Sequence, residues 1–123
     1  MTVGIARITL FLPDSHSLKD KRMVLRRVKA QVRDKFNAAI AEVGDLDLWQ
    51  RAALGITVVG NERAFAEAML DEVVRFVRTR AEVTNVEHEV QTFSDGPGGI
   101  GGFGLHAGIE HWKGDVGDGD IDE

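Results

Sequence analysis

Four segments of the chain show the apolar and polar spacing of β-strands. They cover residues 3–12, 38–43, 48–59 and 83–93. The third segment is the clearest, because Leu54 and Ile56 fall on an apolar face while Arg51 and Thr57 fall on the other face. The same alternation in the first segment places Ala6, Ile8, Leu10 and Leu12 together. We assign these apolar faces to the core and expect the opposite faces to be open.

Two further segments repeat apolar residues at three- and four-residue intervals, which predicts amphipathic helices. The first runs from Ser17 to Phe36, and the second begins after Asn61. Ser17 is a good N-cap, with a hydroxyl able to accept from the amide of Asp20. Asn61 is the N-cap that we expect for the second helix, whose apolar stripe consists of Ala66, Met69, Leu70, Val73 and Val77.

The order of these elements is strand, helix, strand, strand, helix, strand. It predicts an α+β, ferredoxin-like βαββαβ sandwich over residues 1–93, with a four-stranded antiparallel sheet and two helices on one face. The usual spatial order places Arg7 on the open face, where Glu87 or Glu89 of the neighbouring strand could pair with it. His88 alternates with valines, so we expect it to be a core histidine.

Residues 94–123 depart from this pattern. Ten of the fourteen glycines and seven acidic residues lie here, against one basic residue. The backbone entropy of so many glycines predicts a disordered, Gly-rich acidic tail. In such a segment, the spacing of His106, Glu110 and His111 says little about metal binding.

Charge is concentrated in the first predicted helix. Eight of the fifteen Lys and Arg residues fall within Ser17–Phe36 beside only two acidic residues, a formal charge of +6 in a protein of total charge −5. Such a local excess favours an anionic partner, although a solvated outer face is the alternative. The candidate nucleic-acid-binding residues are Lys19, Lys21, Arg22, Arg26, Lys29 and Arg33.

Two smaller features are also candidate sites. The turn of Ser15, His16 and Ser17 combines hydroxyls with helix N-terminal amides, which could hold a phosphate or simply cap the helix. Trp49 and Arg51 combine an aromatic ring with a cation, which could stack on a base or form an oligomer contact.

Several function classes lack the residues they need. The chain has no cysteine, which excludes a Cys-based metal chaperone and thiolate catalysis. The third strand has no aromatic motif of the RNA-recognition type, and the loop after the first strand has no arginine of the acylphosphatase type. We expect no cofactor, no metal site and no catalytic residues. No run of eighteen apolar residues occurs, so we expect a cytoplasmic protein without a membrane partner.

Three stretches of the sequence are similar to the YlxP-like family of small bacterial proteins of unknown function. They are SHSLKDKR at 15–22, LRRVKAQVRDKFNAAIAEV at 25–43 and DLWQRAALGITVVGN at 47–61. The resemblance covers residues 1–93 and implies a ferredoxin-like fold. It also implies a gene neighbourhood shared with translation initiation factor two and ribosome-binding factor A. It implies no established catalytic residues, and the acidic tail departs from the family's usual short ending.

These observations lead to three alternative functions. The first is a non-enzymatic, ribosome-associated accessory factor that contacts rRNA through the basic helix. The second is a homo-oligomeric interaction module, joined through the open sheet face or a sheet edge, with no nucleic-acid role. The third is an enzyme that acts on a phosphorylated small molecule at the turn of residues 15–22.

Overall fold

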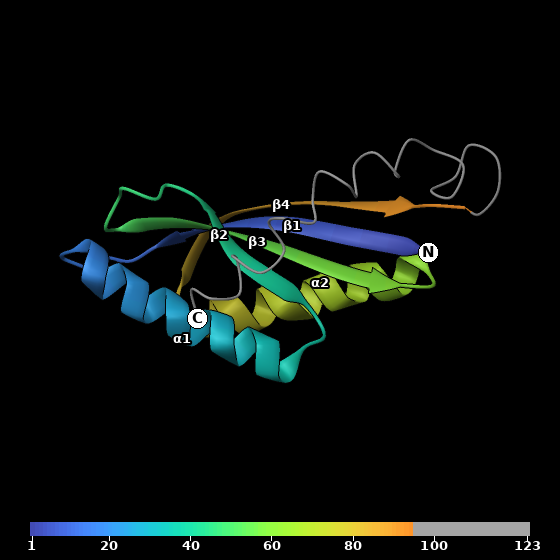
Figure 1. Cartoon of the computed structure of the whole chain (residues 1–123), viewed down its shortest axis with the longest axis horizontal. Coiled ribbons are helices and arrows are strands. Elements are labelled where there is room, and N and C mark those ends of the chain that lie inside the picture. Colours follow the sequence, from blue (N-terminus) through green and yellow to red (C-terminus); the bar gives the residue numbers. More distant parts are fainter. Residues whose placement is uncertain (95–123) are drawn as a thin grey trace, which may run out of the picture. The chain divides into compact units, whose positions relative to one another are not determined.

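The computed structural model describes residues 1–94 of the chain. Its elements are β1 (Thr2–Phe11), α1 (Leu18–Lys35), β2 (Ala39–Gly44), β3 (Arg51–Gly60), α2 (Arg63–Arg78) and β4 (Glu82–Thr92). The strands form an antiparallel sheet in the order β2-β3-β1-β4. Both helices lie on the same side of this sheet (Figure 1). This is the predicted ferredoxin-like arrangement, with β1 and β3 in the centre. The predicted tail falls almost wholly outside the described residues.

The core lies between the sheet and the two helices. Leu54 and Ile56 of β3 are buried, as are Val73 and Val77 of α2. The predicted apolar face of β1 is buried as well, which confirms the assignment of the sheet faces. Each such side chain contributes about 1.5 to 3 kcal/mol by leaving water, so this layer dominates the stability of the fold.

The two helices begin differently. Ser17 is the N-cap of α1, as predicted, and its Oγ accepts a hydrogen bond from the amide of Asp20 at 3.0 Å. The Asp20 carboxylate accepts in turn from the amide of His16 at 3.0 Å. The expected cap of α2 at Asn61 is wrong. The N-cap is Glu62, whose backbone is still extended and whose side chain makes no capping bond, so α2 starts one residue later.

The strand β3 begins at Arg51 and not at Leu48, as the alternation had predicted. The carbonyl of Leu48 accepts a hydrogen bond from Lys21 of α1. The amide of Leu48 donates to the carbonyl of Asp45 at 3.1 Å. Asp45 itself has a φ of 57°, the left-handed conformation of a tight turn. These bonds hold the backbone of Asp45 and Leu48 in a loop, so the strand begins only after it.

The edge strand β4 contains an irregularity opposite Thr9 and Leu10, whose partners are Asn85 and Val83. One extra residue at this point changes the side-chain alternation, which is the usual effect of a β-bulge. As a result Val83 and Val86 both pack against the core, although they are three positions apart.

Both edge strands carry a carbonyl that is already bonded to a helix arginine. Arg33 of α1 donates to the carbonyl of Ile40 on β2 at 3.0 Å. Arg63 of α2 donates to the carbonyl of Val90 on β4 at 3.2 Å. Exposed strand edges pair readily with other strands, and native proteins often protect them. These two arginines therefore make the sheet edges less available for association.

Arg7 does not pair with β4 as expected. Glu87 lies directly opposite Arg7 in the register, and Glu89 accepts a hydrogen bond from Gln91. The guanidinium instead extends across β3 to β2, where a Cβ built on Gly44 would lie 2.7 Å from Nη2 of Arg7. Within the described residues, Arg7 therefore lies on the open face with its charge directed away from the acidic strand.

Candidate nucleic-acid interface

The cations of α1 form a stripe along one flank of the helix. At about 100° per residue, Lys19, Arg22, Arg26, Lys29 and Arg33 fall within an arc of about 80°. We call these five residues the basic stripe. Lys19, Arg22 and Arg26 are exposed, whereas Lys29 and Arg33 are half-buried. The bond from Arg33 to Ile40 shows that the stripe lies on the β2 side of the helix.

No acidic residue of α1 lies within the basic stripe. The acidic residues of α1 are Asp20 and Asp34, and helical geometry puts both outside the arc. Asp20 is also engaged by the amide of His16. The stripe therefore presents several cations along the helix axis, the arrangement that contacts a phosphate backbone without reading sequence.

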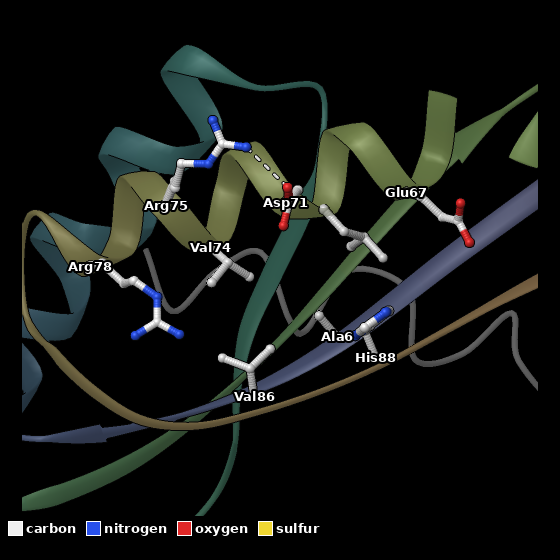
Figure 2. A pocket seen from close by; sticks show the side chains of 9 residues that line it. Ala6, Glu67, Asp71, Val74, Arg75, Arg78, Val86 and His88 are labelled. Carbon is white, nitrogen blue, oxygen red and sulfur yellow. Dashed lines mark hydrogen bonds and ion pairs between the residues drawn. The ribbon is translucent and has the colours of Figure 1, made fainter. Parts of the chain in front are cut away.

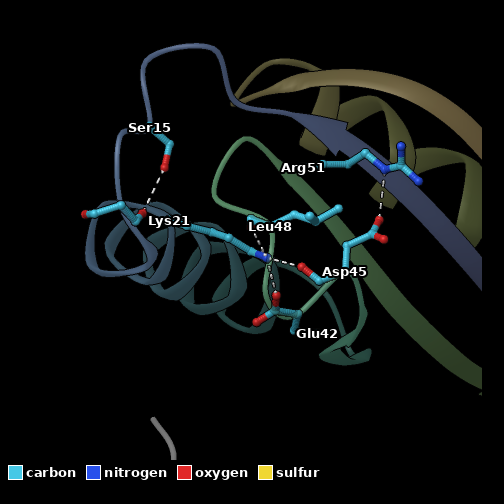
Figure 3. A network of polar contacts seen from close by, with 7 residues as sticks. Ser15, Lys21, Glu42, Asp45, Leu48 and Arg51 are labelled. Carbon is cyan, nitrogen blue, oxygen red and sulfur yellow. Dashed lines mark hydrogen bonds and ion pairs between the residues drawn. The ribbon is translucent and has the colours of Figure 1, made fainter.

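Lys21 does not belong to this surface. Its side chain is only 2% exposed, and its ammonium makes an ion pair with Glu42 at 2.9 Å. It also donates to the carbonyls of Asp45 at 2.5 Å and Leu48 at 2.7 Å. Figure 3 shows this ammonium reaching from α1 to the end of β2 and the following loop. The prediction that Lys21 binds nucleic acid is wrong, because the residue is an internal anchor for the β2–β3 loop.

The sequence contained a signal for this anchor. Lys21 precedes Leu25 by four positions and Val28 by seven, so it lies on the apolar stripe of the helix. Glu42 is two residues after Ile40, so it faces the helices as Ile40 does. A lysine and a glutamate on two facing apolar surfaces indicate a buried ion pair, because a lone buried charge is too costly.

The turn before α1 uses its polar groups within the chain. Ser15 is buried, and its hydroxyl donates to the carbonyl of Ser17 at 3.2 Å. The Ser17 hydroxyl accepts from Asp20, and the amide of His16 donates to the Asp20 carboxylate. The candidate phosphate turn thus has the hydrogen bonds of a helix cap, with a carboxylate where a phosphate would bind.

Trp49 and Arg51 border a hollow of about 540 Å³ lined by Phe11, Leu48, Trp49, Gln50 and Arg51. Trp49 is exposed, and Arg51 is ion-paired with Asp45 at 3.1 Å. The side-chain amide of Gln50 donates to the carbonyls of Pro13 and Ser15. These bonds tie the loop to the turn before α1, so the indole ring is exposed on an anchored segment.

A second hollow, of about 280 Å³, lies between α2 and β4 (Figure 2). His88 lines it and is exposed, so the prediction of a core histidine is wrong. The physical reason is that β4 is an edge strand, whose helix-facing side α2 covers only in part. The two carboxylates of the hollow are already paired, Asp71 with Arg75 at 3.0 Å and Glu67 with Arg63 at 3.3 Å. The hollow therefore offers surface ion pairs and no evident acid–base pair.

Residues 1–94 contain no group of three His, Cys, Asp or Glu side chains arranged to hold a metal ion. Neither helix in this range is long and apolar enough to cross a membrane. His106, Glu110 and His111 lie outside the described residues.

Residues 3–90 match the family described as "Protein of unknown function (DUF503)". The chain is also 38% identical over 81 residues to "Uncharacterized protein YlxP" of Bacillus subtilis (strain 168), covering 66% of this chain and 88% of that protein. Among solved structures it is similar to the de novo designed protein Foldit4, with a TM-score of 0.46 at 14% identity, covering 76% of this chain and 98% of that one. It is also similar to a designed protein with ferredoxin fold, LFR1 1, with a TM-score of 0.44 at 16% identity. The match covers 81% of this chain and 93% of that one.

Proposed function

We propose, from the premise that this chain belongs to the DUF503 family of proteins of unknown function, that it is a non-enzymatic factor that binds RNA. The basic stripe contacts the phosphate backbone, and the partner is the rRNA of a ribosomal subunit. Binding by such a surface is tolerant of sequence, because phosphates carry no base information.

The observation that carries this proposal is the exposure of Lys19, Arg22 and Arg26 on a single flank of α1. Their side chains project into solvent where a polyanion can reach them. The overall charge of −5 does not oppose such binding, because the acidic excess lies in residues 94–123. The cations of the basic stripe create a positive electrostatic potential in their own neighbourhood. The choice of rRNA rests on the gene neighbourhood that the family resemblance implies.

The proposal predicts a strong salt dependence of RNA binding. Each neutralised phosphate of a single strand contributes about −0.7 to the slope of log K against log salt. The triple variant Lys19→Gln, Arg22→Gln, Arg26→Gln should therefore flatten this slope by about 2, roughly a twentyfold change between 50 and 200 mM salt. Fluorescence anisotropy with a labelled single-stranded RNA of mixed sequence measures the slope directly.

A matched control separates the stripe from net charge. Arg27, Arg75 and Arg78 are also exposed but lie outside the stripe, and changing all three to Gln removes the same charge. This control should keep the wild-type slope within about 0.5. Equal slopes for the two triple variants would refute the stripe as the binding surface.

The identity of the RNA needs its own experiment. Ultraviolet crosslinking in growing cells should recover rRNA with the wild-type protein. It should recover much less rRNA with the triple variant Lys19→Gln, Arg22→Gln, Arg26→Gln. Recovery of other RNA classes in proportion to their abundance would refute the ribosomal assignment while leaving the RNA-binding surface intact.

A further inference from the structure

The sheet face opposite the helices carries exposed apolar side chains among charged and polar ones. Ile5 is 48% exposed, Val43 49% and Val59 54%, and all three project from this face. Phe11 is also exposed, at the opposite end of β1 from Ile5, with Arg7 and Thr9 between them on the same face. Several exposed large apolar side chains on one face of a small domain favour an interaction site.

We propose that this open face binds a second copy of the chain in a two-fold symmetric dimer, with the axis parallel to the strands. Rotation about that axis places β1 of one copy over β3 of the other, and β4 of one over β2 of the other. The two open faces then meet as in a β-sandwich, with the sheets about 10 Å apart.

Charge complementarity supports a second copy as the occupant. The Arg7 guanidinium lies against Gly44 on β2, away from Glu87 of its own chain. In the dimer, β4 of the second copy covers β2, so Glu87 of the second copy lies over the strand that the guanidinium has reached. The symmetry forms this pair twice. The backbones of Arg7 and Glu87 are at the same level of the sheet, and rotation about an axis along the strands preserves that level. Gly44 is level with Thr9, two residues along, so the flexible glutamate side chain has to bridge that offset to reach the guanidinium.

The size of the face is sufficient for a dimer. Four strands at about 4.8 Å spacing and ten residues at about 3.3 Å give a footprint of roughly 600 Å² per copy. The two copies together bury roughly 1,200 Å², which lies at the lower end of stable interfaces. A reversible dimer, populated at raised protein concentration, follows from this area.

The structure also favours the face over the edges. Arg33 and Arg63 already occupy carbonyls of the two edge strands. The basic stripe lies on a helix, on the other side of the sheet, so the dimer leaves it accessible. An experiment can therefore refute the dimer without refuting the proposed RNA binding, and the reverse also holds.

The test uses charge reversal in the full chain. Arg7→Glu alone and Glu87→Arg alone each place like charges together twice, so each variant should weaken the dimer on the order of a hundredfold. Mixing the two variants creates only opposite pairs, since Glu at position 7 meets Arg at position 87 and Arg7 meets Glu87. The mixture should therefore associate although neither component does. Sedimentation equilibrium over a wide concentration range measures the dissociation constants of the wild type, of each variant and of the mixture.

Other outcomes would overturn the proposal. A wild-type protein that stays monomeric at millimolar concentration has no such dimer, and its open face is then exposed or covered by another occupant. A dimer that both charge reversals leave unchanged uses a different surface. As a matched control, Arg75→Glu on α2 should not alter the wild-type dissociation constant. Retained circular dichroism of each variant shows that lost association is not lost folding.

Discussion

Replacing Lys21 with Met should lower the free energy of unfolding by about 3 kcal/mol. Breaking a buried ion pair by removing one partner costs about 3 to 5 kcal/mol, because the remaining charge stays buried. We expect the lower end of this range, since the side chain of Glu42 is 21% exposed and can keep some hydration. Methionine retains most of the packing volume, so the loss reports on the ammonium and its bonds. Urea denaturation monitored by circular dichroism measures the difference.

Two controls identify what Lys21 contributes. Lys19→Met changes an exposed lysine on the same helix turn and should have little effect on stability. The double variant Lys21→Met, Glu42→Leu replaces the ion pair by apolar groups, which is often neutral. Here it should recover only part of the loss, because the carbonyls of Asp45 and Leu48 still lack their donor. Equal stability of the Lys21 and Lys19 variants would contradict the role of an internal anchor.

Replacing Leu54 with Ala should destabilise the protein by about 2 to 5 kcal/mol. Leu54 is fully buried in the layer between the sheet and the helices, so the truncation loses apolar burial and leaves a cavity. Thr57→Ala is the matched control on the same strand, because Thr57 faces the open side and is only half-buried. It should cost less than about 1 kcal/mol.

Denaturant melts of the two β3 variants should be run at several protein concentrations. If the open face binds a second copy, the stability of the wild type rises with concentration. The difference between the two variants at the lowest concentration then reports on the monomer alone. A larger loss for Thr57→Ala than for Leu54→Ala would show that the burial of the two faces is reversed.

Much of the fold could be predicted from local patterns. The two-residue period around Leu54 and the four-residue spacing around Leu25 report which side of each element leaves water. Element order and the handedness of the connections then leave few arrangements, and the ferredoxin-like one follows. The cap at Ser17 was also predictable, because its partner Asp20 is three residues away. Each of these features depends on neighbours within about one turn of helix or one strand.

The candidate site was less predictable, because the sequence does not show whether the charged group of a side chain is buried or exposed. Lys21 and Arg22 are adjacent, yet the first is buried and the second exposed. The partners of Lys21 come from β2 and the loop that follows, 21 to 27 residues along the chain. The direction of Arg7 likewise depends on β2, and the exposure of His88 on how far α2 covers β4.

The sequence by itself determined the type and order of the elements, the core face of β1 and β3, and the basic helix. The tertiary structure alone decided which cations of that helix reach solvent, where β3 begins, and how the charges of the open face are arranged. The physical reason is that periodicity records burial of an element's side, which is a local property. The position of a charged side chain depends on which carbonyls and carboxylates can replace the water molecules that hydrate it. These partners are often distant in the sequence and come together only when the chain folds.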